Sequence, residues 1–372
     1  MRSDDILDGV RELFLLDPDV VFLNHGSYGA CPKPVFERYQ AWQRELEREP
    51  VDFISRRLPE LLDHARAELG AFVGADGDDL TFVPNATTGV NMAARALDLQ
   101  PGDEVLATNL EYGACDLTWE WLCERTGARY VRTEVGQLLA QRSERTRAVF
   151  LSHITSETAL LLPVAEVVAQ ARAEGLVTIV DGAHAVAQVD LDLSALGADF
   201  YAGNCHKWLC APKGSGFLYV RPEWQERVDG PIVSWGYEEP VTFISRTERQ
   251  GTRDSAAYLA VPDAIAFQRE HDVRDRCVAL AREARRELCT LLDTEPLAPD
   301  AQVLQMASVR LPEPQPDLSQ RLFDEHRIEI PTMRHGRDDL LRISIAPYTE
   351  REDVERLLDA LPDALRTSRS PA

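Results

Sequence analysis

One lysine of this chain stands where its amine could do covalent chemistry. Lys207 lies in the segment NCHKW, directly after an apolar run typical of a strand. Lys33 lies between two prolines, and Lys213 follows a proline in a glycine-rich turn. Because these are the only three lysines, Lys207 is the candidate for an amine that forms a Schiff base with an aldehyde.

A carboxylate ends another apolar run. Asp181 closes the segment VTIVD and is followed by GAHA. A carboxylate buried at a strand end usually has a cationic partner, and the protonated pyridine nitrogen of pyridoxal 5′-phosphate is such a partner. Lys207 and Asp181 together therefore predict a pyridoxal phosphate site. Taken alone, Asp181 is also compatible with a helix cap at a strand-to-helix turn.

Three further segments carry residue types that suit such a site. The segment NATTG, from residue 85, lies between a predicted strand and a predicted helix, where free backbone N–H groups bind phosphate. Tyr112 follows a strand ending near Thr108 and could lay its ring on the pyridine, although a packed tyrosine is the alternative. Arg342 is a single charge inside an apolar strand pattern, which favours either a bound carboxylate or a structural salt bridge.

Composition narrows the classes of partner. The net charge of −22 argues against nucleic acid and anionic membrane surfaces. Seven cysteines without a CxxC pair predict neither a disulfide framework nor a zinc site, and no Walker, GxGxxG or HExxH motif occurs. With no secretion signal and no apolar stretch near ~18 residues, we expect a cytoplasmic protein with a small-molecule substrate and no metal.

The elements that must position these residues follow an α/β pattern. Short apolar runs alternate with amphipathic stretches, which predicts a mostly parallel seven-stranded sheet between helices. The predicted strands are 79–83, 104–108, 128–131, 148–152, 177–181, 200–203 and 216–220. The predicted helices are 59–73, 88–97, 116–126, 163–174 and 193–196. Catalytic groups are expected at the carboxyl ends of the parallel strands.

Beyond Pro262 the pattern changes to that of a smaller α+β domain. We expect one long helix over 264–292, then strands at 303–309 and 341–345 and helices at 317–326 and 350–361. The length of 372 residues suits about two domains. The expected division is an N-terminal segment, 1–20, that packs on the small domain, a large cofactor-binding domain, 21–255, and a small C-terminal domain, 256–372.

These motifs resemble those of class V, fold-type I pyridoxal phosphate enzymes. Within that family the chain is similar to the isopenicillin N epimerase-like branch, which is related to cysteine desulfurases and carbon–sulfur lyases. The resemblance covers about residues 20–361. It rests on LNHGSYGACP, VPNATTGVN, VDGAHA, DFYAGNCHKWL, VSWGY, RQGTRD and LRISIAPY.

The resemblance implies a role for each chemical residue. Lys207 would be the Schiff-base lysine, Asp181 would pair with the pyridine nitrogen, and His184 would lie near the phenolic oxygen. Tyr112 would stack on the ring and share in catalysis, and Arg342 would bind the substrate carboxylate.

The same resemblance implies a second group of contacts in a homodimer with shared active sites. Thr252 would reach the phosphate of the partner subunit, and Ser156 would lie among the cofactor-binding residues. The phosphate within one chain would be held by Ala86, Thr87, Asn204 and His206. A loop over the substrate would contain Asn24, His25 and Gly26.

Departures from the family pattern affect the expected activity. Relatives often carry Asn or Ser-Pro-Thr-Gly where this chain reads SETA from Ser156, and the connection from Trp235 to Gly251 is shorter than in the epimerases. No cysteine follows Cys289, so desulfurase chemistry, which needs a mobile late cysteine, is not expected.

We expect an enzyme that forms a Schiff base between its cofactor and an amino acid and then removes the Cα proton. The favoured outcome is carbon–sulfur β-lyase chemistry on an S-substituted cysteine in natural-product biosynthesis, because elimination needs one base and a leaving group. The alternatives are an amino-acid epimerase, a decarboxylation-coupled oxidative deaminase of a cysteine S-conjugate, and an aminotransferase. A cofactor-binding protein without catalysis is the non-enzyme alternative.

Overall fold

The computed structural model describes residues 9–366, and within them the chain folds as two compact units. The smaller unit comprises Met1–Lys33, Thr155–Leu161 and Arg269–Ala372, as far as these ranges are described. The larger unit comprises Pro34–Ile154 and Leu162–Gln268. A short segment from the middle of the chain thus belongs to the smaller unit. The domain division expected from the sequence stays a prediction.

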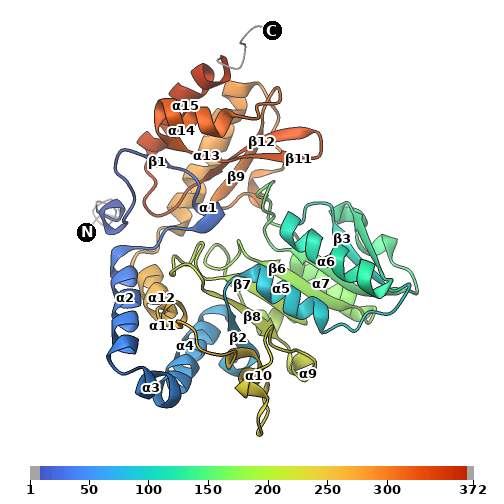
Figure 1. Cartoon of the computed structure of the whole chain (residues 1–372). Helices are drawn as coiled ribbons and strands as arrows, with labels where there is room; N and C mark the ends of the chain where they lie inside the picture. The colour runs from blue at the N-terminus through green and yellow to red at the C-terminus, as the bar shows by residue number, and fades with distance from the viewer. Residues whose placement is uncertain (1–8, 367–372) are drawn as a thin grey trace. The chain divides into compact units, whose positions relative to one another are not determined.

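The larger unit is built on a seven-stranded sheet (Figure 1). Its strand order is β2-β8-β7-β6-β5-β3-β4, in which β8 is antiparallel to both neighbours and the other adjacent pairs are parallel. The strands are β2 (Leu80–Val83), β3 (Glu104–Thr108), β4 (Arg129–Thr133), β5 (Thr146–Ser152), β6 (Val177–Gly182), β7 (Phe200–Asn204) and β8 (Gly216–Val220). The predicted mostly parallel sheet is confirmed.

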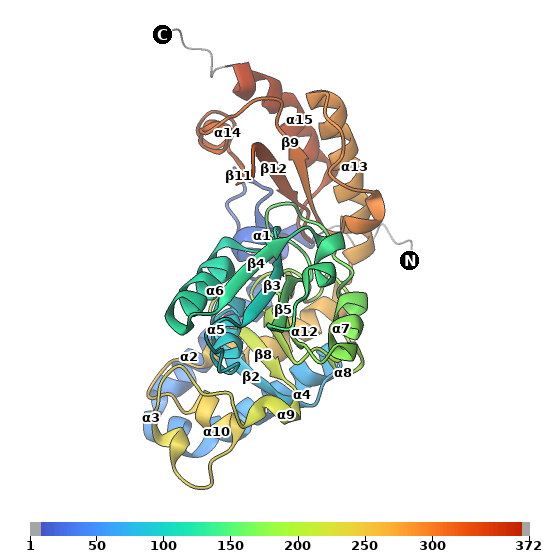
Figure 2. The same ribbon diagram turned by 90° about the vertical axis from the view of Figure 1, so that its right-hand side faces the viewer.

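Helices cover both faces of this sheet. Figure 2 shows α5 and α6 on one side of it and α7 and α8 on the other. The helices assigned to this part of the chain are α2 (Lys33–Arg48), α3 (Pro50–Asp52), α4 (Leu58–Val73), α5 (Ala86–Arg95), α6 (Gly113–Thr126), α7 (Val164–Ala173), α8 (Leu193–Leu196), α9 (Pro222–Gln225), α10 (Phe243–Glu248), α11 (Ala256–Leu259) and α12 (Val261–Glu270). The central strands are buried along their whole length, as expected of parallel strands covered on both faces.

The smaller unit has the α+β character predicted from the sequence. Its antiparallel sheet has the order β11-β12-β9, and a separate parallel pair joins β1 to β10. The strands are β1 (Val21–Phe22), β9 (Met306–Arg310), β10 (Ile328–Glu329), β11 (Thr332–His335) and β12 (Asp338–Ser344). The helices are α1 (His25–Tyr28), α13 (Arg274–Leu292), α14 (Leu318–His326) and α15 (Arg351–Arg366).

The prediction of a single long helix over 264–292 is wrong. The chain forms α12 and α13 instead, interrupted at residues 271–273. In the interruption the side chain of Asp272 accepts a hydrogen bond from the backbone N–H of Arg274, which competes with helical pairing. Residues 271–273 contain neither glycine nor proline. The hydrophobic pattern therefore predicts a helix that continues across them. Within residues 9–366, no helix combines the length and apolar character that crossing a bilayer requires.

Candidate active site

Asp181 lies at the carboxyl end of β6, where the sheet register aligns it with Ser152 of β5 and Ala202 of β7. Its side chain is 3% exposed. Oδ1 accepts the backbone N–H of Ala183 at 2.9 Å, and Oδ2 lies 3.5 Å from the thiol of Cys115. Burial raises the pKa of Asp181, while the Ala183 N–H and the charge of Lys207 lower it. Such a group gains most from a cation held against it.

Lys207 follows the end of β7, the next strand of the sheet. Its Nζ lies 3.1 Å from Nε2 of His184, and Nδ1 of His184 accepts the indole N–H of Trp208 at 3.2 Å. His184 and Lys207 lie close together because each follows the carboxyl end of its strand, and β6 and β7 are parallel neighbours in the sheet. The structure therefore brings three of the predicted residues, Asp181, His184 and Lys207, to one place in the larger unit.

The start of α5 lies beside the end of β7. Asn85 caps the helix by accepting the N–H of Thr88 at 2.9 Å, so α5 begins at Ala86, two residues before the predicted start. Oδ1 of Asn204 accepts the N–H of Ala86 at 2.8 Å and joins strand to helix. A Cβ at Gly89 would lie 2.9 Å from Cβ of Ala202, so only glycine allows this close approach.

His206 is held by the loop that precedes β8. Its Nδ1 lies 2.8 Å from the carbonyl oxygen of Ser215, which can only accept, so Nδ1 carries a proton. Burial lowers the pKa of His206 to about 4. The ring is therefore neutral at neutral pH, with Nε2 as an acceptor. Binding a phosphate through Nε2 would require a second proton, which the anion itself would favour.

Tyr112 is the N-cap residue of α6, and its side chain is 45% exposed. Its carbonyl oxygen accepts the backbone N–H groups of Cys115 and Asp116, which fixes the backbone at this point. The exposure removes the alternative of a tyrosine packed in the core. The ring is accessible to a flat ligand, as the stacking role requires.

Arg342 lies at the centre of a separate cluster of hydrogen-bonded residues within the smaller unit. The guanidinium is 1% exposed. Nη1 donates to the carbonyl oxygen of Ser156 at 2.7 Å and lies 3.3 Å from its hydroxyl, and Nη2 donates to the hydroxyl of Ser27 at 3.1 Å. Ser156, predicted among the cofactor contacts, thus lies with the predicted carboxylate-binding arginine. Its assignment to the cofactor stays a prediction.

The segment Asn24–Gly26 belongs to the same unit as Arg342. The amide of Asn24 donates to Glu329 at 2.9 Å, and Nδ1 of the fully buried His25 lies 3.0 Å from the hydroxyl of Tyr348. A Cβ at Gly26 would lie 2.7 Å from Sδ of Met306, so a larger residue there would require the Met306 side chain to move.

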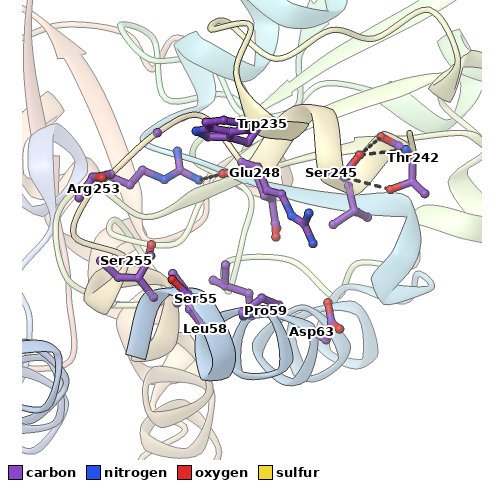
Figure 3. Close-up of a pocket in the computed structure, with 16 residues that line it drawn as sticks. Ser55, Leu58, Pro59, Asp63, Trp235, Thr242, Ser245, Glu248, Arg253 and Ser255 are labelled. Atoms are coloured by element: carbon purple, nitrogen blue, oxygen red, sulfur yellow. Dashed lines mark hydrogen bonds between the residues drawn. The ribbon is translucent and has the colours of Figure 1, made fainter. Parts of the chain in front are cut away.

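Thr252 lies in the exposed loop after α10. It lines an open cavity of about 570 Å³ whose lining residues all belong to the larger unit (Figure 3). Trp235, 71% exposed, stands over this cavity, and the side chain of Arg253 donates to the carbonyl oxygen of Glu248. Thr252 is the one predicted cofactor contact that the structure places in this cavity lining.

Sequence reasoning missed a second buried carboxyl group near Asp181. Glu111 accepts hydrogen bonds from the hydroxyls of Thr108 and Ser152. Burial raises the pKa of Glu111 to about 8, and the charge of Asp181 adds to the effect. The available signal was an acidic residue three positions after the end of β3, directly before Tyr112.

The residues present fit pyridoxal phosphate. A buried carboxyl whose pKa is raised by desolvation suits a pyridinium, and an amine lies one strand away. The N-terminus of a ten-residue helix stands beside them. Within the described ranges, no three His, Cys, Asp or Glu side chains are grouped as ligands for a metal ion.

Comparison with known proteins agrees with this chemistry. Residues 30–357 match the family described as aminotransferase class-V. The chain belongs to this family. It is a pyridoxal phosphate-dependent enzyme of fold-type I, as the motifs predicted.

Individual relatives indicate the branch. The chain is 39% identical to isopenicillin N epimerase of Streptomyces clavuligerus, over 95% of this chain and 97% of that protein. It is 38% identical to isopenicillin N epimerase of Amycolatopsis lactamdurans, with the same coverage, and 28% identical to a probable chloroplastic L-cysteine desulfhydrase of Arabidopsis thaliana, over 94% and 84%. A cysteine desulfurase structure from Escherichia coli matches with a TM-score of 0.80 at 24% identity, over 96% of this chain and 98% of that one.

Proposed function

We propose that Lys207 binds the cofactor aldehyde and then removes the Cα proton of an amino-acid substrate. The 3.1 Å contact between Nζ of Lys207 and Nε2 of His184, one strand from buried Asp181, carries this proposal. Lysine is a strong base when it is held without a charge, so a site that favours the neutral amine prepares it for both steps.

The cofactor would be held by side chains of the larger unit. Asp181 would face the pyridine nitrogen, Tyr112 would cover the ring, and His184 would donate to the phenolic oxygen. When bound, pyridoxal phosphate supplies an electron-withdrawing ring that stabilises the negative charge developing at the substrate Cα. The phosphate would be bound at the start of α5 and beside it by Ala86, Thr87, Asn204 and His206.

Arg342 would bind the α-carboxylate of the substrate. A guanidinium offers two parallel N–H donors to a carboxylate, and this one is buried and already held in place by oxygens of Ser27 and Ser156. We infer that Ser156 orients the guanidinium. The segment Asn24–Gly26, whose turn is fixed by contacts of its own, would complete this end of the substrate site.

For the fate of the substrate we propose loss of a β-sulfur group from an S-substituted cysteine. Elimination needs one base, which Lys207 supplies, and a leaving group on Cβ. Similarity to a protein named as a desulfhydrase supports this outcome. Epimerisation is the second candidate, favoured by identities of 39% and 38% to two isopenicillin N epimerases. It requires a second acid on the opposite face of the substrate.

We also propose a homodimer with shared sites. Thr252 lines the same cavity as Trp235, and Ile232 and Val233, shortly before Trp235 in the chain, are also exposed. Large exposed apolar side chains gathered in one region are typical of an interaction surface. A second copy of this chain would cover them and bring Thr252 towards the partner's phosphate.

One incubation separates the two candidate activities. The purified enzyme is given S-substituted L-cysteines and unsubstituted L-amino acids in deuterated water, and the products are analysed for pyruvate, released thiol and chirality. A lyase yields pyruvate with an equal amount of thiol. An epimerase yields the D-amino acid with deuterium at Cα and no pyruvate. Absence of Cα exchange across the whole panel would contradict the proposed role of Lys207.

A further inference from the structure

Trp208 determines which nitrogen of His184 carries a proton. Its indole N–H lies 3.2 Å from Nδ1 of His184, and the two side chains are 2% and 3% exposed. An indole nitrogen can only donate, so Nδ1 of His184 must accept. An imidazole that accepts at Nδ1 is neutral and carries its single proton on Nε2.

The tautomer of His184 in turn determines the protonation state that Lys207 can adopt. Nε2 of His184 lies 3.1 Å from Nζ of Lys207. With the proton on Nε2, this hydrogen bond needs a lone pair on Nζ. An ammonium has three donors and no acceptor, and would meet the imidazole donor to donor. The contact therefore fits the neutral amine.

The backbone on both sides of the contact is anchored. The amide of Gln268 donates to the carbonyl oxygen of Trp208 at 2.8 Å, and the amide of Gln188 donates to the carbonyl oxygen of His184 at 2.7 Å. The backbone at Trp208 is thus held from α12, and the backbone at His184 from the turn after β6. Separating the two rings would break the buried hydrogen bond between them.

We propose that Trp208 is a positioning residue that fixes His184 in the Nε2-protonated form, so that His184 holds Lys207 as a neutral amine. The inference rests on the proposed role of Lys207 but not on the fate of the substrate. Two further titratable groups interact electrostatically with Lys207, namely Asp181 and His206. An ionised Asp181 would favour the ammonium, but burial raises the pKa of Asp181 and so opposes an ionised pair.

The small number of lysines makes the test direct. Nitrogen-15 labelling of lysine and histidine side chains allows NMR to follow Lys207 against Lys33 and Lys213, and to report the tautomer of His184. In cofactor-free protein at neutral pH we expect an unprotonated Nδ1, a protonated Nε2 and a neutral Lys207 amine. In Trp208→Phe the tautomer preference should be lost, and protonation of Lys207 should become about tenfold more favourable.

Trp119→Phe is the matched control. Trp119 is equally buried, but its ring N–H has no hydrogen-bond partner among the described residues, so its replacement should leave both signals unchanged. If Trp208→Phe does not fold, wild-type protein decides: a protonated Nδ1 on His184, or a Lys207 that titrates together with Lys33, overturns the inference. Because no substrate is present, failure of the product assay and failure of this inference are distinguishable.

Discussion

Glu111 should make the stability of the protein depend on pH in a direction opposite to that of an ordinary carboxylate. The ordinary pKa of glutamate is 4.5, and burial raises that of Glu111 to about 8. In this interval the folded protein keeps a proton that the unfolded chain releases. The stabilising contribution is therefore complete below 4.5 and is lost as pH rises through the interval to about 8. Each pH unit costs at most about 1.4 kcal/mol, so the whole interval is worth at most about 5 kcal/mol.

Glu111→Gln removes the titration and keeps the size and polarity of the side chain. Urea unfolding of the cofactor-free protein, measured from pH 5 to pH 8, should show the variant gaining stability on wild type as pH rises. Glu104→Gln is the control, on β3 just before Glu111: the hydrogen bond from Ser143 lowers the pKa of Glu104, so its stabilising contribution is complete above the ordinary pKa of glutamate and this variant should be less stable than wild type by a constant amount from pH 5 to pH 8. A constant difference between Glu111→Gln and wild type at every pH would refute the reasoning.

Three further predictions concern the site. Asp181→Asn should keep some cofactor but lose turnover by several hundred-fold, or about 4 kcal/mol of barrier, because an amide cannot hold the pyridine proton; near wild-type turnover would remove Asp181 from this role. Arg342→Lys should weaken substrate affinity more than cofactor affinity, because an ammonium does not reproduce the guanidinium fork; equal damage to both dissociation constants would make Arg342 structural. Statistical mixing of inactive Lys207→Ala with Thr252→Ala, a variant expected to bind the cofactor weakly, should restore activity towards a quarter of wild type, because half the dimers gain one complete site; a fully active monomer in sedimentation would contradict shared sites.

The sequence predicted best those parts of the fold in which the local hydrophobic pattern matches the burial of the element in the structure. The ranges of β3 and β8 were predicted to the residue, because each is an apolar run bounded by turn residues. Asp181 and Lys207 stood out for the same reason, as polar residues directly after such runs. Residues 271–273 interrupt a helical pattern without a glycine or proline, so periodicity could not show the break.

Contacts that depend on strand order could not be read from the sequence. Glu111 and Ser152 meet because β3 and β5 are neighbours in the sheet, although β4 lies between them in the chain. The hydrogen bond from Trp208 to His184 likewise requires β6 beside β7. Ser156 was grouped with the cofactor by motif position, whereas its contacts join it to Arg342 in the smaller unit.

The central claim, that Lys207 carries the cofactor, is tested most directly by reducing the purified enzyme with borohydride and locating the fixed pyridoxyl group by peptide mass spectrometry. We predict the label on Lys207 alone, with its loss in Lys207→Ala and its retention in Lys33→Ala and Lys213→Ala. A borohydride-reducible Schiff base that persists in Lys207→Ala would contradict the account.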